Sequence, residues 1–95
     1  MHIDTGSGVK IHKGNRAKIK GCTIQRCLNG IEVISADPRI IMNKIGKNYE
    51  NAIMTVAKNG LRCDGLIKFN EIDRNKECGI LVAGKENFTK IIKNQ

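Results

Sequence analysis

Aromatic residues are scarce in this chain. Tyr49, Phe69 and Phe88 are the complete set, and there is no tryptophan. Proteins that bind single-stranded nucleic acid stack bases on exposed aromatic side chains. Phe69 alternates with Ile67 in an apolar run, so we assign it to the core and expect no stacking platform. The scarcity of aromatics therefore weighs against nucleic acid as a partner.

Long apolar stretches are missing as well. No run approaches the roughly 18 residues needed to span a membrane, so we expect no membrane partner. No segment carries a convincing apolar stripe at helical spacing. The short apolar runs alternate instead, as in Ile67–Phe69 and Ile80–Val82, and they are rich in Ile and Val. Such runs are typical of strands and predict an all-β fold.

What the chain has is an internal repeat. The segments "IKGCTIQRCLNGIEV" (19–33), "IIMNKIGKNYENAIMT" (40–55) and "IKFNEIDRNKECGILV" (67–82) align by eye, and "IIKN" (91–94) begins a fourth. Self-similarity with a period of about 20–30 residues marks a solenoid. Two columns share the steps of 21, 27 and 24 residues, namely Ile19, Ile40, Ile67, Ile91 and Cys22, Asn43, Asn70, Asn94.

Each repeat contains three short strands separated by Asn or Gly, which tolerate the positive φ of a sharp bend. Stacked repeats of this kind predict a right-handed parallel β-helix with three sheets around one narrow core. The Asn column either forms an amide ladder or only supports a bent backbone, whereas Cys22 and Cys27 cannot continue a ladder. Ten isoleucines should point inward: Ile19, Ile24, Ile31, Ile40, Ile45, Ile53, Ile67, Ile72, Ile80 and Ile91.

The 95 residues form a single domain. We place a partial coil at 8–18, complete coils at 19–39, 40–66 and 67–90, and a further partial coil at 91–95. Because a solenoid end exposes core and unpaired strands, we expect the chain to be a segment of a longer β-helix. Neighbouring coils, or alternatively another chain, would then cover its ends.

The formal net charge is +8, from 17 Lys and Arg against 9 Asp and Glu. An excess of positive charge favours binding to an acidic partner. The alternative is that the many lysines reflect a bias in amino-acid composition and lie on a solvated surface without a binding role. We expect a protein partner with an acidic surface. Oligomeric state does not follow from the sequence.

Four cysteines, Cys22, Cys27, Cys63 and Cys78, leave two alternatives, a disulfide framework or free thiols. No signal peptide precedes the repeats, and Cys22 and Cys78 fall at core or turn positions, where buried thiols are common. We therefore expect free thiols in a cytoplasmic protein. The cysteines lack zinc-ligand spacing and His2 and His12 lie outside the coils, so we expect no metal site and no cofactor.

The repeat "IKFNEIDRNKECGILV" resembles the pattern I-x-x-N-x-I-x-x-N-x-x-x-G-I-x-V of the pectin-lyase-like superfamily of right-handed β-helices. Within it, the likeness is greatest to the CASH-type repeats of F-box-only proteins. Their two connector types resemble "ISADPRI" (34–40) and "NGLRCDGLI" (59–67). The resemblance implies a β-helix that holds protein substrates for ubiquitin transfer. The superfamily also includes polysaccharide lyases and glycoside hydrolases, so fold alone leaves the function open.

The carboxylates do not support an active site. Calcium-dependent lyases need several carboxylates around the ion, and glycosidases need a close pair. The carboxylates here do not recur in one column, and only Asp37 and Asp64 could be neighbours on successive coils. Each has an adjacent arginine, Arg39 or Arg62. We interpret both aspartates as turn caps or arginine partners and name no catalytic residue.

The long connectors are the surface most typical of a binding site, because loops on a rigid scaffold commonly carry recognition. We therefore predict partner binding through Arg39, Lys58, Arg62 and Lys85, or else through the outward column Lys20, Ile41, Lys68 and Ile92. The chain then acts as a non-catalytic protein-interaction or scaffold module, with substrate recognition in an F-box-type ligase as one form. Two alternatives are a carbohydrate-active enzyme fragment and a structural component of a filament or large assembly.

Overall fold

The computed structural model describes residues 7–13, 16–58 and 60–95, so His2 and Asn59 lie outside the described residues. Over the described ranges the chain forms short strands joined by turns and loops, and no helix there is long and apolar enough to cross a membrane. The strands are β1 (Val9–Ile11), β2 (Lys18–Lys20), β3 (Thr23–Gln25), β4 (Ile31–Ile34), β5 (Arg39–Ile41), β6 (Lys44–Gly46), β7 (Ile53–Val56), β8 (Leu66–Lys68), β9 (Glu71–Asp73), β10 (Ile80–Ala83) and β11 (Lys90–Ile92).

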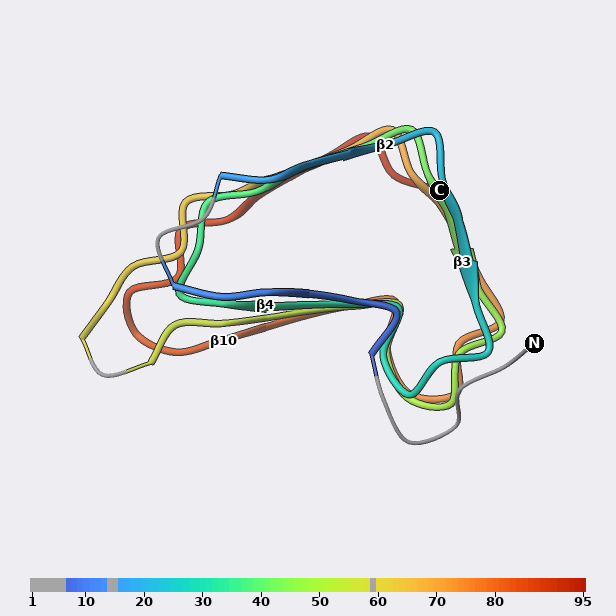
Figure 1. Ribbon diagram of the computed structural model, residues 1–95, viewed down its shortest axis with the longest axis horizontal. Coiled ribbons are helices and arrows are strands. Elements are labelled where there is room, and N and C mark those ends of the chain that lie inside the picture. The colour runs from blue at the N-terminus through green and yellow to red at the C-terminus, as the bar shows by residue number, and fades with distance from the viewer. Residues whose placement is uncertain (1–6, 14–15, 59) are drawn as a thin grey trace.

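These strands form three parallel sheets with the orders β1-β4-β7-β10, β2-β5-β8-β11 and β3-β6-β9. Viewed along the solenoid axis, successive coils lie over one another around a three-sided outline (Figure 1). The register pairs Ile19 with Ile40, Ile40 with Ile67 and Ile67 with Ile91. The predicted parallel β-helix and the steps between its coils are thereby confirmed.

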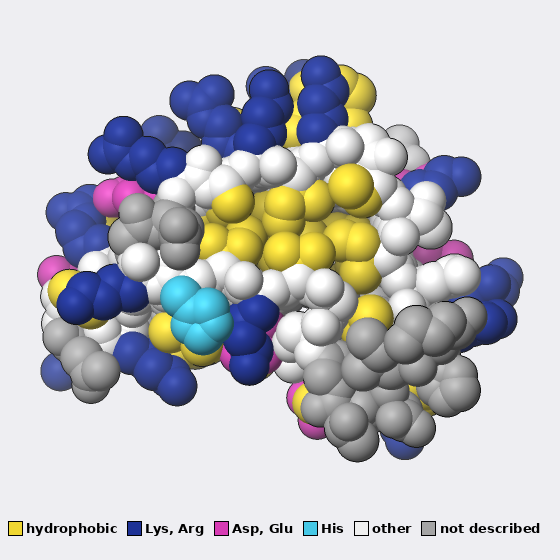
Figure 2. Space-filling model, viewed as in Figure 1, with side chains coloured by type: hydrophobic (Ala, Val, Ile, Leu, Met, Phe, Trp, Pro, Cys, Tyr) yellow, Lys and Arg dark blue, Asp and Glu magenta, His cyan; other side chains and the backbone are white. Residues whose placement is uncertain are grey.

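Isoleucine fills the core, and seven of the ten predicted residues are buried. Ile72 and Ile80 are partly buried and pack against the core. Ile91 stacks on Ile67, but it is 47% exposed because β11 is the edge strand of its sheet. Figure 2, viewed along the same axis, shows apolar side chains gathered at the centre of the end that faces the viewer.

Asparagine ladders run along the solenoid beside this core. The side-chain Nδ2 of Asn43 donates to Oδ1 of Asn70 at 3.0 Å, and Nδ2 of Asn70 donates to Oδ1 of Asn94 at 3.0 Å. Of the two alternatives for this column, the amide ladder is therefore confirmed. Cys22 joins the ladder through its backbone alone, since its N–H donates to Oδ1 of Asn43 at 2.9 Å and its thiol lies 3.6 Å from the carbonyl of Lys20.

The predicted position of the bend is wrong by one residue. Positive φ falls on Met42 (56°), Phe69 (57°) and Lys93 (50°), each directly before the ladder asparagine, and on Gly21 (69°) in the same column. Each asparagine stabilises the turn through the hydrogen bonds of its side-chain amide, and the residue before it takes the left-handed conformation.

This bend also overturns the assignment of Phe69 to the core. A residue with positive φ directly after β8 breaks the period-2 alternation, so the side chain of Phe69 does not follow Ile67 inward. It is 46% exposed.

All four cysteines are free. Cys27 and Cys63 are buried, but Cys22 and Cys78 are exposed, contrary to the expectation of buried thiols at those two positions. Cys22 stands at the end of the first asparagine column, where no described coil lies beyond it. Burial raises the pKa of the Cys27 thiol because the charged thiolate loses solvation.

Candidate functional site

The outward side of the sheet β2-β5-β8-β11 carries a group of cations without an acidic residue among them. In β2, β5 and β8 the middle isoleucine is buried and the two flanking residues face outward. The register stacks these flanking residues in two columns. We call this surface the basic face; it consists of Lys18, Arg39, Leu66 and Lys90 in one column and Lys20, Ile41, Lys68 and Ile92 in the other.

The second column is the outward column predicted from the sequence, so its existence as a column is confirmed. Figure 2 shows Lys and Arg side chains along the edge of the molecule where Figure 1 labels β2. Five of the eight positions are cationic and none is acidic. Neighbouring strands lie about 4.8 Å apart, and each strand of the sheet contributes at least one of these cations.

None of these five cations takes part in an ion pair with another described residue. The other two sheets differ, because Lys44 lies 3.8 Å from Glu71 and Lys10 lies 4.0 Å from Glu32. Uncompensated like charges held on a rigid sheet create a positive potential that attracts anions. The basic face is therefore the part of the described surface best suited to an acidic partner.

Aliphatic side chains alternate with the cations on this face. Ile41 faces outward beside Arg39 on β5, and Leu66 faces outward beside Lys68 on β8. On β11, Ile92 is 38% exposed. A mixture of apolar area and arginine or lysine is typical of surfaces that contact other proteins.

An exposed apolar corner adjoins the basic face. It consists of Met42, which is 51% exposed, and Phe69, which is 46% exposed, and both take the positive φ described above. The Nζ of Lys68 lies 4.8 Å from the centroid of the Phe69 ring. This corner is not among the surfaces predicted from the sequence. The signal that could have revealed it is Gly21, whose place in the same column marks a left-handed position.

The structure divides the predicted connector site among several places. Arg39 starts β5 and belongs to the basic face, and it lines a hollow with Arg16, Lys90 and the two aspartates Asp37 and Asp64. Lys85 lines a different hollow. The backbone N–H of Lys58 binds the hydroxyl of Ser35 at 3.0 Å.

Arg62, the fourth predicted residue, is engaged by two neighbours. Its Nε lies 3.1 Å from Oδ2 of Asp64, and its guanidinium stacks on the Phe88 ring at 4.5 Å from the centroid. The four predicted residues therefore line no common hollow among those described, and their role in binding stays a prediction.

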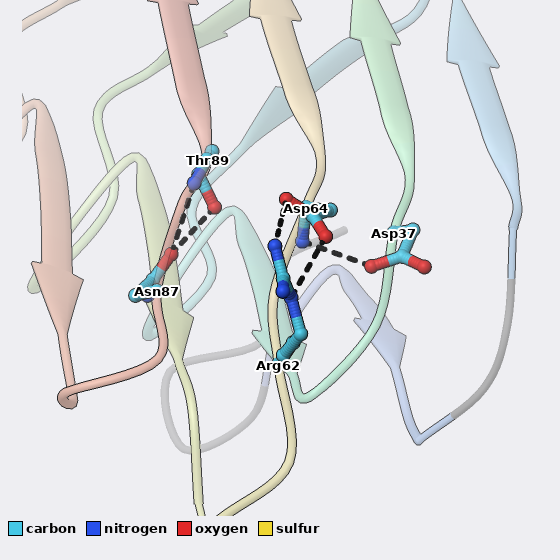
Figure 3. A network of polar contacts seen from close by, with 5 residues as sticks. All are labelled: Asp37, Arg62, Asp64, Asn87 and Thr89. Carbon is cyan, nitrogen blue, oxygen red and sulfur yellow. Dashed lines mark hydrogen bonds and ion pairs between the residues drawn. The ribbon is translucent and has the colours of Figure 1, made fainter.

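Asp37 and Asp64 are neighbours on successive coils, as predicted. The backbone N–H of Asp64 donates to Oδ1 of Asp37 at 2.9 Å, and Arg62 donates to both carboxylate oxygens of Asp64 (Figure 3). No ion pair joins Arg39 to Asp37 among the described residues. These contacts close a turn and neutralise one carboxylate, which supports the interpretation as caps and arginine partners.

Asn87 and Thr89 extend the polar contacts beside these aspartates. The hydroxyl of Thr89 donates to Oδ1 of Asn87 at 2.6 Å (Figure 3), and Nδ2 of Asn87 donates to the Thr55 hydroxyl at 2.7 Å. The bond to Thr55 joins the connector between β10 and β11 to strand β7. Over the residues that the structure describes, no group of three or more His, Cys, Asp or Glu could hold a metal ion.

Comparison with known proteins agrees with the sheet topology. The family model described as "Right handed beta helix region" matches residues 2–95, nearly the whole chain. No curated protein and no solved structure matches the chain. Parallel sheets, stacked coils and the extent of the family match together show that the chain belongs to the family of right-handed parallel β-helices.

Proposed function

We propose that the chain is a non-catalytic interaction module that binds an acidic protein partner through its basic face. The observation that carries the proposal is the set of five cations on four stacked strands, without a carboxylate at any of the eight positions. Complementary charge steers a partner to such a surface and fixes its orientation. The rigid solenoid holds the charges in place, so little ordering is needed when the partner binds.

The most specific form of this proposal is substrate recognition in an F-box-type ubiquitin ligase, or alternatively a scaffold role in a larger assembly. The F-box form is supported by the resemblance of the repeats to the CASH type. A cytoplasmic location belongs to the same proposal and is supported by the four free thiols. We also propose neighbouring coils or another chain over the solenoid ends, supported by the exposed Ile91.

The contacts of Asp37 and Asp64 favour this function over that of a carbohydrate-active enzyme. Acid–base chemistry on a sugar needs carboxylates free to act on the substrate. Asp64 is bound by Arg62, and Asp37 accepts the backbone N–H of Asp64. Both contacts serve the connector turn.

The experiment is a binding titration of the 95-residue chain against fluorescently labelled poly-L-glutamate, read as anisotropy. One variant changes Lys18, Lys20, Arg39, Lys68 and Lys90 to Gln. A control variant removes the same charge from the sheet β3-β6-β9 and its turns by changing Arg26, Lys44, Lys47, Arg74 and Lys76 to Gln.

We expect the basic-face variant to bind at least about tenfold more weakly than the control, which corresponds to about 1.4 kcal/mol. Binding by the unchanged chain should weaken as salt is raised, because charges on the surface are screened over about 10 Å at 0.1 M ionic strength. Equal losses in the two variants would reduce the attraction to diffuse charge and overturn the proposal.

A further inference from the structure

The corner beside the basic face is built to hold large side chains outward. Met42 and Phe69 occupy equivalent turn positions on successive coils, with φ of 56° and 57°. The backbone N–H of Met42 donates to the carbonyl of Lys68 at 3.2 Å, and that of Phe69 donates to the carbonyl of Ile92 at 3.3 Å. The asparagines that follow are locked in the buried ladder. The corner is therefore as rigid as the sheet that it borders.

Keeping these two residues there has a cost that the fold does not require. A left-handed position is least strained for glycine, and this column contains Gly21 at the equivalent site. Met42 is nevertheless 51% exposed and Phe69 is 46% exposed. Adjacent exposed apolar side chains of this size are typical of binding surfaces, and here they adjoin an uncompensated positive face.

We propose that the basic face and the apolar corner of Met42 and Phe69 form one docking surface for an acidic protein segment that carries an aromatic or large aliphatic side chain. That side chain packs on Met42 and Phe69, while carboxylates on either side of it face Lys20 and Lys68. This inference rests on the proposed function and adds the apolar anchor. The basic face attracts acidic partners in general. The apolar corner raises the affinity for those that also carry a suitably placed aromatic or large aliphatic side chain.

The side chains among the cations favour protein over the other polyanions. Ile41 and Leu66 are aliphatic and offer no π-face on which a base can stack. Membrane-surface elements separate an apolar side from a basic side, whereas here aliphatic residues and cations alternate. A protein surface with mixed apolar and acidic groups complements this pattern.

The test compares two acidic polymers, poly-L-glutamate and a random copolymer of glutamate and tyrosine, titrated against the full 95-residue chain. Phe69→Asn removes the ring and keeps a residue that tolerates positive φ. Met42→Asn does the same one coil earlier. Phe88→Ala is the matched control, since Phe88 is 47% exposed and also stacks with a cation but lies in a connector. Far-UV circular dichroism checks that each variant keeps its β-sheet signal.

We expect the unchanged chain to bind the copolymer about tenfold more tightly than poly-L-glutamate, as for one well-packed aromatic anchor. Phe69→Asn should remove most of that advantage, measured as the ratio of the two affinities, and Met42→Asn part of it. Phe88→Ala should leave the ratio and the binding to poly-L-glutamate unchanged. Equal affinity for the two polymers, with no effect of Phe69→Asn, would overturn the anchor and leave the proposed function standing. Failure to bind either polymer would overturn the proposed function itself. Tighter binding to polyuridylate, or to vesicles of phosphatidylserine and phosphatidylcholine, would assign the surface to nucleic acid or lipid and overturn the inference.

Discussion

Asn43 and Asn70 lie one above the other on successive coils, and Oδ1 of Asn70 accepts two hydrogen bonds from Asn43, one from its side-chain Nδ2 and one from its backbone N–H, both at 3.0 Å. The two residues are 2% and 1% exposed. One side-chain oxygen thus satisfies two buried donors of the preceding coil. The ladder that results fixes the turn and, with it, the direction of the side chains on both sides of that turn.

Replacing Asn70 by Ala should be strongly destabilising. The change removes the acceptor of two buried N–H groups of Asn43, one on its backbone and one on Nδ2, each at a cost of about 1–3 kcal/mol. The other N–H of Nδ2 keeps its bond to the carbonyl of Ile19. We expect a loss of roughly 2–4 kcal/mol, measured by urea denaturation followed by circular dichroism. Asn94→Ala is the matched control at the edge of the ladder, where Asn94 is less buried. A loss at Asn94 as large as that at Asn70 would show that burial of the donors is not the cause.

A second prediction concerns the depth of the core. Ile45 is 1% exposed, and Ile45→Ala should cost about 2–5 kcal/mol, as large-to-small core changes do. Ile91→Ala should cost much less, because Ile91 is 47% exposed and has a neighbouring coil on one side. Denaturation midpoints of the two variants measure the difference. Similar losses would mean that the edge coil is covered by structure beyond the described stack.

Much of the architecture was predictable because it repeats. The columns of Ile40 and Asn43 recur at the same steps along the chain, and a parallel stack converts equal steps directly into pairing. The pairing of Asp37 with Asp64 followed from the same steps.

The left-handed turn position repeats in every coil, but its residue type does not. It is occupied by Gly21, Met42, Phe69 and Lys93, which have little chemistry in common, so the sequence does not show the repeat. For that reason the alternation of Ile67 and Phe69 wrongly predicts a core position for Phe69, and the sequence pattern does not reveal the apolar corner. The placement of Lys58 and Lys85 does not follow from the repeat either, because the connectors that carry them differ in length.

The four thiols should react in two classes. Cys22 and Cys78 are exposed and should be labelled quickly by iodoacetamide in the folded chain, whereas Cys27 and Cys63 are buried and should react slowly. Burial also raises the pKa of the Cys27 thiol, so less of it is thiolate near neutral pH, and its labelling should accelerate only at more alkaline pH. Mass spectrometry of peptides over time measures the four rates. Rapid labelling of Cys27 at neutral pH would contradict its buried position.

Extending the first ladder should stabilise the fold. In Cys22→Asn the new amide can donate Nδ2 to Oδ1 of Asn43, which already accepts the backbone N–H of residue 22 at 2.9 Å. The contact repeats the geometry of Asn43 on Asn70 and should add about 0.5–1.5 kcal/mol. The free energy of unfolding measures this gain, with Cys22→Ser as a control that removes the thiol and adds no amide. A variant no more stable than the serine control would show that the end of the ladder is too open to benefit.

The most direct test of the central claim is a map of where an acidic polymer binds. In an NMR titration of the isotope-labelled chain with poly-L-glutamate, backbone amide shifts should change most along β2, β5, β8 and β11 and should reverse when salt is added. Shifts concentrated around Lys58, Arg62 and Lys85 would instead assign binding to the connectors. Changes spread evenly over all three sheets would contradict a specific face.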